Sequence, residues 1–451
     1  MISLRDAWLT YDDRPVLAGV DLDLDEGELV VVSGPTGAGK STLLGVLAGL
    51  VPRFSGGELR GDLLLDGEGI LHLPPRERVH AIGYVGQDPA SGFVTDTVEE
   101  ELAYGMEQLG LPPATMRRRV EETLDLLGIA ELRARDLRTL SGGQQQRVAI
   151  GSVLAMHPRL LVLDEPTSAL DPTAAEEVLA TLARLVDDVG LAVLVAEHRL
   201  ERVIPFADRM VLVRGDGSLR VGLPADVLTT SPVVPPIVEL GRGLGWTPLP
   251  VSVREARRRA RGVVLPAAPP PAHTGTGEQV LSASGLSVAR GKRVVLREVD
   301  LTVRSGRVCA VMGRNGAGKS TLLWTLQGTR KRTTGRVAVA GADPAGLDPA
   351  ARRSRIGLVP QDADDLLYLE TVDEECAAAD AGPKSPPAPA ARCWTGWCPT
   401  SPATGTRGTS PRDSGWRWCW RSCSPEPRPW CCSTSPPVAS TTPRSARWRP
   451  P

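Results

Sequence analysis

Two stretches of the chain alternate between apolar and polar residues and then enter a glycine-rich loop. They are LAGVDLDLDEGELVVVSG, residues 17–34, and LREVDLTVRSGRVCAVMG, residues 296–313. Alternation with a period of two is typical of a strand with one buried face, and the apolar run before each loop is typical of a buried strand. After each loop, apolar residues recur at helical spacing. The pattern predicts strand, turn, strand, glycine loop and helix at both places.

The two stretches are parts of a long-range repeat. VVVSGPTGAGKSTLLGVLAGL, residues 30–50, is echoed by CAVMGRNGAGKSTLLWTLQGT, residues 309–329. A repeat of this length predicts two similar domains. We place the first at residues 1–230 and the second at residues 280–381.

The segment between the repeats, residues 231–279, is predicted to be a linker. It is rich in proline and carries the basic run REARRRARG, residues 254–262. Proline breaks regular elements and stiffens a connecting chain. The basic run could touch membrane phosphate or nucleic acid, and we expect it instead to be solvated.

Net charge and hydropathy narrow the class of protein. The 451 residues include 52 basic and 53 acidic side chains, a formal charge of −1, so the chain has no overall basic field and no nucleic-acid partner is expected. Apolar runs such as residues 191–196 are far shorter than the roughly 20 residues that cross a bilayer, and the first 13 residues lack a signal-peptide pattern. We expect a cytosolic chain that does not span the membrane.

The composition changes near residue 382. Six of the eight cysteines and seven of the ten tryptophans follow residue 390, among proline, serine, arginine and threonine. A zinc cluster or a disulfide framework could use such cysteines, but their spacing lacks the paired CxxC pattern of zinc sites. The segment 382–451 therefore has no assigned metal site.

Both glycine loops fit the pattern GxxxxGK[ST], which is a phosphate-binding loop. Glycines let backbone N–H groups converge on phosphate oxygens, the following helix contributes its positive end, and the lysine reaches the β- and γ-phosphates. The hydroxyls of Ser41 and Ser320 are the predicted Mg²⁺ ligands. The residues assigned to the nucleotide in the two loops are Gly34, Pro35, Thr36, Gly37, Ala38, Gly39, Lys40, Ser41 and Thr42, and Gly313, Arg314, Asn315, Gly316, Ala317, Gly318, Lys319, Ser320 and Thr321.

An apolar strand that ends in two acids follows the first loop. The run LLVLDEPT begins at Leu160 and places Asp164 and Glu165 at its end. Asp164 is expected to hold hydrated Mg²⁺, and Glu165 is expected to act as a general base toward the attacking water.

The run LSGGQQQR, residues 140–147, stands before this strand, with its serine 23 residues ahead of Asp164. It resembles the signature of the ATP-binding cassette (ABC) ATPases. The resemblance covers roughly residues 2–228 and implies an α/β fold: a P-loop core sheet, an antiparallel β subdomain and an α-helical insert, duplicated in this chain. In this family the signature serves the nucleotide of the opposite cassette. The residues that carry it here are Ser141, Gly142, Gly143 and Gln144.

The same resemblance implies roles for four further positions. Tyr11 matches the aromatic residue that stacks on adenine, and residues 168–171 match the loop that crosses the cassette dimer. Gln87 matches the Q-loop residue that senses Mg²⁺ and the membrane partner, and His198 matches the switch histidine that contacts the γ-phosphate. Hydrolysis then requires a second cassette, from a homodimer or a partner ATPase.

Residues 85–112 and 140–172 further resemble the ATPases of energy-coupling factor transporters, which import cobalt and vitamins. This implies ATP hydrolysis with Mg²⁺, transmembrane permease subunits as partners, and a peripheral position at the cytoplasmic face of the membrane. Two alternatives remain. One is a soluble ABC ATPase that acts on ribosomes or DNA, and the other is a defective gene product that retains only ATP binding.

The second repeat is incomplete. Gln361 matches the Q-loop position and is the second predicted Mg²⁺ ligand there, but Val288 stands where Tyr11 stood. Beyond residue 381 the sequence has no LSGGQ, no apolar strand ending in an acid pair and no switch histidine.

A slip of the reading frame near residues 381–382 is our hypothesis for the missing half. Read with G/C-rich codons and a shift of two bases, TSPRDSG at 409–415 becomes LSEGQR, and WCCSTSPP at 430–437 becomes VLLDEPT. The recovered serine and aspartate are about 23 residues apart, as Ser141 and Asp164 are. We therefore expect residues 382–451 to be out of frame and largely unstructured.

Overall fold

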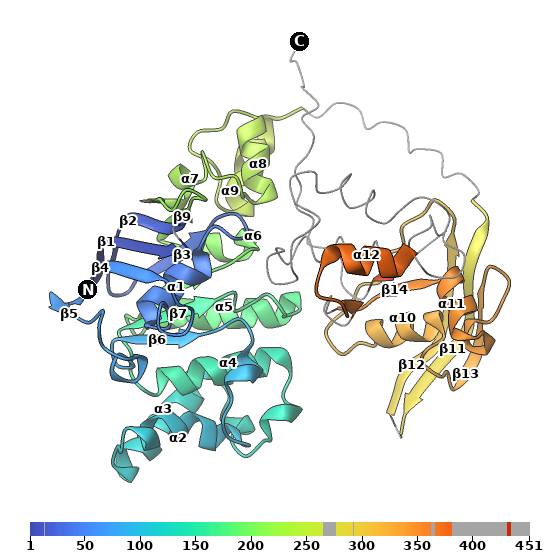
Figure 1. Ribbon diagram of the computed structural model, residues 1–451, viewed down its shortest axis with the longest axis horizontal. Coiled ribbons are helices and arrows are strands. Elements are labelled where there is room, and N and C mark those ends of the chain that lie inside the picture. The colour runs from blue at the N-terminus through green and yellow to red at the C-terminus, as the bar shows by residue number, and fades with distance from the viewer. Residues whose placement is uncertain (13, 265–276, 292, 362–365, 381–430, 434–451) are drawn as a thin grey trace. The chain divides into compact units, whose positions relative to one another are not determined.

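The computed structural model describes residues 1–12, 14–264, 277–291, 293–361, 366–380 and 431–433 (Figure 1). It divides into two compact units, Met1–Pro266 and Ala267–Pro451. No helix of the described residues is both long and apolar enough to cross a bilayer.

Unit 1 begins with an antiparallel sheet of four strands. In sheet order they are β2 (Arg14–Leu24), β1 (Ile2–Tyr11), β4 (Glu58–Leu65) and β5 (Glu68–Gly69). Leu4 pairs with Leu22 and with Leu63, and all three side chains are buried. The alternation of the sequence therefore places one face of this sheet against the core.

A second sheet of six strands forms the centre of unit 1. In sheet order they are β10 (Leu219–Gly222), β9 (Arg209–Val213), β3 (Leu29–Ser33), β8 (Ala192–Ala196), β7 (Leu160–Asp164) and β6 (Ile82–Val85). All neighbours are parallel except β10 and β9. Every residue of β3, β7 and β8 is buried, as expected for the middle strands of a covered parallel sheet.

Two apolar cores cover the two faces of this central sheet. Leu161 and Leu163 of β7 pack in one core, and Leu160 and Val162 of the same strand pack in the other. The first core includes the helical insert, seen at the bottom of unit 1 in Figure 1, and the second includes the antiparallel sheet and α1. The helices are α1 (Lys40–Ala48), α2 (Val98–Gln108), α3 (Pro113–Leu127), α4 (Gly142–Leu154), α5 (Pro172–Asp187), α6 (Leu200–Val203) and α7 (Pro224–Val227). The α/β fold predicted from the sequence is confirmed in unit 1.

The segment expected as a linker, residues 231–279, contains two helices that pack on unit 1. They are α8 (Pro236–Gly243) and α9 (Val253–Arg259). Val238 and Leu249 are buried in the core, and the guanidinium of Arg242 donates a hydrogen bond to the carbonyl of Ser231 at 2.8 Å. Pro236 stands in the first turn of α8, where its missing N–H costs nothing, so proline starts this helix instead of breaking it.

Unit 2 contains a three-stranded antiparallel sheet in the order β12 (Arg293–Arg304), β11 (Gln279–Arg290) and β13 (Thr334–Val339). Its helices are α10 (Lys319–Gln327), α11 (Pro349–Arg355) and α12 (Val372–Asp380). Short 3₁₀ helices complete both units: η1 (Pro75–Glu77), η2 (Pro89–Gly92), η3 (Ala130–Leu132), η4 (Leu137–Thr139), η5 (Ile204–Phe206), η6 (Ala260–Gly262) and η7 (Pro344–Gly346).

The buried strand predicted directly before the second glycine loop does not form. Residues 308–312 have no assigned strand, and Val308 is 100% and Met312 88% exposed. The equivalent strand in unit 1, β3, is hydrogen-bonded on both sides, by β8 and by β9. Within the described residues of unit 2, no strand pairs with 308–312, which explains why an apolar sequence alone is not enough here.

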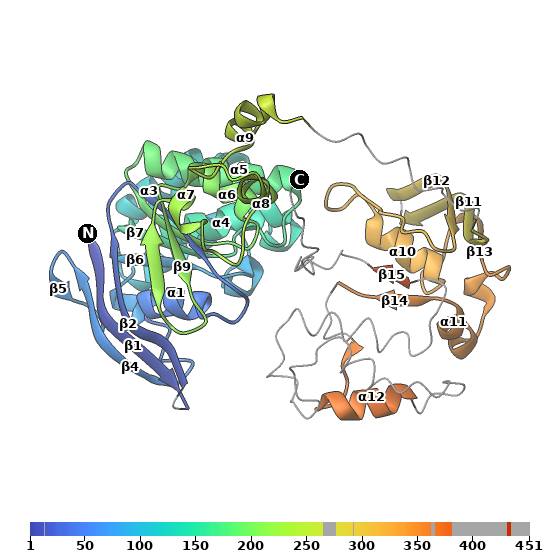
Figure 2. The ribbon, with the colours of Figure 1, turned by 90° about the horizontal axis from the view of Figure 1, so that it is seen from above.

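Part of the tail that we expected to be unstructured is a strand. β15 (Cys431–Ser433) pairs in parallel with β14 (Gly357–Val359), and Figure 2 shows the two side by side. Val359 pairs with Ser433 as Val85 of β6 pairs with Leu163 of β7. Backbone pairing needs no particular side chain, so these three residues can fill the position of β7. The rest of that expectation lies outside the described residues.

Candidate functional site

The first glycine loop joins β3 to α1 and is held in a shape that requires glycine. Gly34, Gly37 and Gly39 have φ of 154°, 79° and 101°. A Cβ on Gly34 would lie 2.4 Å from the carbonyl oxygen of Val213, and one on Gly39 would lie 2.8 Å from Cγ1 of Val16. The loop ends at the start of α1, where unpaired N–H groups and the helix dipole favour an anion.

Lys40 folds back over this loop. Its side chain is buried, and Nζ donates hydrogen bonds to the carbonyls of Gly34 at 2.9 Å and Pro35 at 3.0 Å. The ammonium is therefore fixed at the mouth of the loop, where a phosphate chain would lie.

Asp164 ends β7 beside the start of α1. Burial raises the pKa of Asp164 above its ordinary value, and the charge of Glu165 adds to the rise, whereas a hydrogen bond from Ser41 and the charge of Lys40 oppose it. A buried carboxylate next to a hydroxyl is a pair of hard oxygen donors, the ligand type that Mg²⁺ prefers.

Glu165 lies at the centre of the site. Its Oε1 is 2.8 Å from Nε2 of His198, and its Oε2 accepts a hydrogen bond from Nε2 of Gln87 at 2.9 Å. Gln87, Glu165 and His198 follow β6, β7 and β8, whose carboxyl ends meet at one edge of the parallel sheet. The structure thus brings together the three side chains that the sequence assigned to catalysis.

Tyr11 is at the end of β1. Its hydroxyl shares a 2.9 Å hydrogen bond with Oγ of Ser55, and a Cβ on Gly57 would lie 3.0 Å from the ring. Glycine at position 57 therefore allows the chain to pass close to the tyrosine ring.

The signature residues form the beginning of α4, where Ser141 and Gly142 are exposed, Gln144 is half-buried and Gly143 is buried. Ser141 is the N-cap: its Oγ accepts from the N–H of Gln144 at 3.4 Å, while Oε1 of Gln144 accepts from the N–H of Ser141 at 3.0 Å. A Cβ on Gly143 would lie 2.9 Å from Cβ of Ala174, so glycine here lets α4 approach α5. This reciprocal cap fixes the first turn of the helix and leaves Ser141 and Gly142 accessible.

In the proposed dimer-crossing loop, residues 168–171, Asp171 has a local role: its side chain accepts from the N–H of Ala174 and caps α5.

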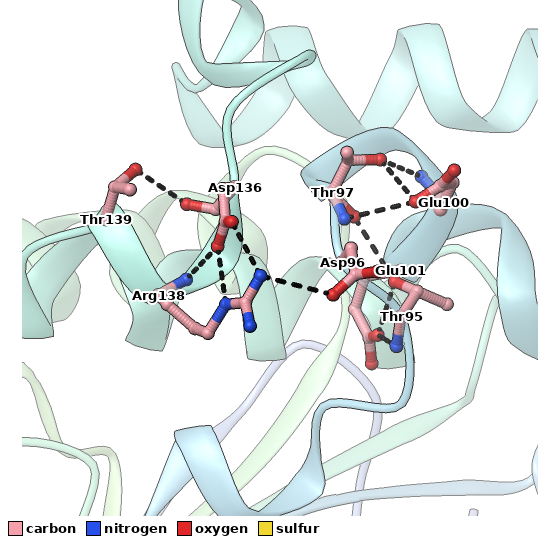
Figure 3. A network of polar contacts seen from close by, with 8 residues as sticks. All are labelled: Thr95, Asp96, Thr97, Glu100, Glu101, Asp136, Arg138 and Thr139. Carbon is pink, nitrogen blue, oxygen red and sulfur yellow. Dashed lines mark hydrogen bonds and ion pairs between the residues drawn. The ribbon is translucent and has the colours of Figure 1, made fainter.

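A network of polar contacts connects residues 95–101, which follow the Q-loop, to residues 136–139, which precede the signature (Figure 3). The buried carboxylate of Glu101 accepts from the N–H groups of Val94 and Thr95, at 3.0 and 2.9 Å. The N–H of Leu137 donates to the carbonyl of Asp96 at 2.9 Å, and Arg138 forms ion pairs with Asp136 and Asp96 at 2.9 and 3.6 Å. The chain after Gln87 is therefore joined to the chain just before Ser141.

Glu197, the residue that follows β8, was not among the site residues predicted from the sequence. It is 2% exposed, and its Oε1 accepts a hydrogen bond from the N–H of Thr167 at 2.9 Å. The available signal was one acid at the end of the apolar run LAVLVA. An ionisable residue in that position is unusual because burying a charge is costly.

The second glycine loop repeats the local geometry of the first. Gly313, Gly316 and Gly318 have φ of 151°, 76° and 97°. Nζ of Lys319 donates to the carbonyls of Gly313 and Arg314 at 2.7 and 2.9 Å. The positions equivalent to Asp164 and Glu165 lie outside the described residues, and among the residues described in unit 2 there is no cluster like the one around Glu165.

Together these features define a P-loop protein with an ATPase-type site: a phosphate loop, a strand-end acid pair, and a glutamate held by histidine and glutamine. The family model described as "ABC transporter" matches residues 17–168 and 296–406. The chain is 52% identical over 417 residues to a putative ABC transporter ATP-binding protein of Streptomyces avermitilis, covering 84% of this chain and 74% of that protein. A relative from Methanosarcina acetivorans with the same description is 35% identical over 426 residues, covering 83% and 66%.

The chain belongs to the ABC transporter family and is an ABC-type ATPase. Among solved structures, it is similar to cbiO1 from Clostridium perfringens, described as part of the ABC transporter complex cbiONQ. That similarity has a TM-score of 0.47 and 27% identity, and covers 57% of this chain and 98% of that one.

Proposed function

We propose that this chain binds and hydrolyses ATP as the nucleotide-binding subunit of a membrane transporter, and that the energy moves a solute across the membrane. The observation that carries the proposal is Glu165, held between His198 at 2.8 Å and Gln87 at 2.9 Å, beside Asp164 and the glycine loop. A carboxylate fixed in this way can accept a proton from a water that attacks phosphorus.

The residues around the first loop fit Mg-ATP. Backbone N–H groups of the loop and the N-terminus of α1 would hold the phosphates, and Lys40 would exchange its two carbonyl partners for phosphate oxygens. Ser41 and Asp164 would hold Mg²⁺, which supplies neutralisation of phosphate charge when bound. Because burial already makes the negative charge of Asp164 costly, a nearby dication would stabilise that carboxylate.

The site requires a second cassette in this proposal. The signature, Ser141 to Gln144, presents its exposed helix start outward and would face the γ-phosphate held by another copy of unit 1 or by a partner ATPase. Unit 2 has the glycine loop and Lys319 but no described equivalent of Glu165, so two copies of unit 1 form the complete pair of sites.

The helical insert is the part that we propose docks onto a transmembrane permease. A cavity of about 390 Å³ lies between α2 and α3, and its charged lining residues are Glu99, Glu100, Glu107, Arg117 and Arg133. A recess with acidic and basic groups, in the insert that follows the Q-loop along the chain, suits a permease segment that carries complementary charges. With the runs at 85–112 and 140–172, this supports an importer of the energy-coupling factor type at the cytoplasmic face of the membrane.

The incomplete second cassette supports the frame-slip hypothesis further. β15 takes the place of β7 beside β14, at nearly the position where the shifted frame restores VLLDEPT. The DNA sequence across codons 375–390 shows whether the frame slips there, and the codons for residues 409–437 show what the shifted frame encodes. Lack of a shifted frame that encodes both missing motifs would refute the hypothesis.

The function is tested with purified full chain and Mg-ATP. Glu165→Gln should lower the hydrolysis rate by about 100-fold or more while ATP binding persists, because the base is lost and the phosphate loop is unchanged. Glu298→Gln is a matched control, since Glu298 is another glutamate with a positive φ, 47° against 51°, on β12 of unit 2. Equal rates in the wild-type chain and Glu165→Gln would contradict the proposal.

Transport is tested by restoring solute uptake to a strain that lacks the ATPase. Uptake restored by the wild-type chain and not by Glu165→Gln supports the transport role. Hydrolysis without restored uptake, together with co-purification with ribosomes, would favour a soluble ABC ATPase instead.

A further inference from the structure

We propose that Glu197 is a positioning residue that holds together the two loops carrying Glu165 and His198. The inference rests on the proposed function, because it assigns Glu197 to the same ATPase site. Glu197 is the first residue after β8 and directly precedes His198. At 2% exposure its side chain does not reach solvent, so it acts through the groups around it and not on substrate.

The carboxylate of Glu197 is bonded to both loops. It accepts a hydrogen bond from the N–H of Thr167, two residues after Glu165, at 2.9 Å. The N–H of Arg199, one residue after His198, also donates to it. One side chain therefore fixes the separation of the two loops just beyond the residues that meet at 2.8 Å.

Backbone contacts complete the attachment. The N–H of Glu165 donates to the carbonyl of Ala196 at 2.9 Å, and the N–H of Glu197 lies 3.4 Å from the carbonyl of Val32, at the end of the strand that carries the glycine loop. Glu165 has a φ of 51°, a left-handed conformation that is unfavourable for a residue other than glycine. Such a conformation persists only where the surrounding contacts hold it, and the bond from Thr167 to Glu197 is one of them.

Keeping the carboxylate of Glu197 negatively charged in its buried position is energetically unfavourable. Burial raises the pKa of Glu197 above its ordinary value, and the charge of Glu165 adds to the rise, while the backbone N–H groups of Thr167 and Arg199 oppose it. No ion pair within the described residues includes Glu197. An apolar side chain at this position would avoid the cost of burying a charge. What the carboxylate adds is the pair of hydrogen bonds to the two loops.

The expected result of removing the carboxylate is a loss of turnover with little change in ATP affinity. A shift of about 1 Å in a reacting group can lower a rate by roughly 100-fold. Glu197→Ala should therefore lower kcat by about 10- to 100-fold, with KM for ATP within about twofold, because Lys40 and the glycine loop are untouched. Glu197→Gln keeps an acceptor oxygen for Thr167 but turns an amide donor toward Arg199, so its kcat should fall by about three- to tenfold.

Glu28→Gln is the matched control for stability. Glu28 is also a buried carboxylate, at 9% exposure, that accepts a backbone N–H, from Asp25 at 2.9 Å, and it pairs with Arg209 away from Glu165. This variant should lower the melting temperature as Glu197→Gln does, yet keep kcat. A normal kcat in both Glu197 variants, or a raised KM with normal kcat, would overturn the proposal.

Amide hydrogen exchange separates this inference from the proposed function. The N–H groups of Thr167 and Arg199 should exchange at least about tenfold faster in Glu197→Ala than in the wild-type chain, and in Glu28→Gln they should not change. Unchanged exchange at both amides in Glu197→Ala would refute the attachment even if ATPase activity is present. Absence of ATP hydrolysis in the wild-type chain would refute the function and leave this measurement valid.

Discussion

The two glycine loops of this protein have nearly the same sequence and shape, but the segments that precede them differ in how they are paired and buried. Their glycines match within a few degrees, with φ of 154°, 79° and 101° in unit 1 and 151°, 76° and 97° in unit 2. In unit 1 the loop follows β3, which is buried between β8 and β9, whereas in unit 2 it follows residues 308–312, where Val308 is fully exposed. The loop conformation is therefore local, and the strand that presents the loop to the acid pair depends on distant segments.

The largest expected difference between the two loops is in how much their lysines, Lys40 and Lys319, contribute to the ATPase rate. Lys40→Ala should abolish most hydrolysis, by about 100-fold or more, because Lys40 faces the site that contains Asp164 and Glu165. Lys319→Ala should change the rate by less than about twofold, since the described part of unit 2 has no such acids. Steady-state ATPase assays of both variants measure this, and similar losses in the two would show that unit 2 is also active.

The equivalent first glycines should differ in stability. At Gly34 a Cβ would lie 2.4 Å from the carbonyl oxygen of Val213, while at Gly313 the nearest atom is Cβ of Ala317 at 3.5 Å. Both alanine variants pay for an unfavourable φ, but only Gly34→Ala meets a backbone clash, so it should lose about 2 kcal/mol more than Gly313→Ala. Calorimetric unfolding of the two variants gives the difference, and equal losses would mean that the two loops are packed alike.

Two equivalent arginines, Arg78 in unit 1 and Arg352 in unit 2, should also differ in how much they stabilise their units, by a smaller amount than the glycines. Arg78 is 3% exposed and donates to the carbonyls of Val46, Leu47 and Leu73, around the end of α1. Arg352 donates to the carbonyl of Gly328, at the end of α10. Arg78→Ala should cost about 3 kcal/mol of unfolding free energy and Arg352→Ala about 1 kcal/mol. Urea titrations test this, and an equal cost would contradict the difference in burial.

The smallest expected effect concerns the link between the Q-loop and the signature. The side chain of Arg138 is 78% exposed, so its ion pairs with Asp96 and Asp136 are screened by water. Arg138→Ala should leave the urea midpoint of unfolding unchanged within error, because water screens these charges. A clear shift of the midpoint in the same titration would show that these exposed charges hold the two segments together.

The sequence predicted features that depend on neighbouring residues and failed for features that depend on distant segments. The glycine loops, the strand ending at Asp164 and the helix start at Ser141 are local features, and they were predicted correctly because turn geometry, apolar runs and capping are specified by neighbouring residues. Residues 308–312 have the correct apolar pattern, but no strand in the described part of unit 2 pairs with them. Residues 231–279 were expected to be a linker because of their prolines. In the described part of that segment, α8 and α9 form because Val238 and Leu249 pack on unit 1.

For the candidate site, too, the sequence predicted some residues and missed one. The roles of Gln87 and His198 were expected from the resemblance to ABC ATPases, and the role of Glu165 from its place after an apolar strand. Parallel strand ends bring the three side chains together. Glu197 was missed because its importance lies in two hydrogen bonds to backbone N–H groups, which leave no pattern in the sequence beyond one acid after an apolar run.

The most direct test of the account is the mass of the Glu165→Gln chain in solution with and without Mg-ATP, measured by light scattering after size-exclusion chromatography. The account predicts that the signature of a second copy covers the bound ATP and that the two copies form a dimer. The mass should therefore rise from that of one 47.9 kDa chain to twice that value. The rise should disappear in Lys40→Ala and in Ser141→Arg. A chain that binds ATP at saturation and remains a monomer would contradict the account.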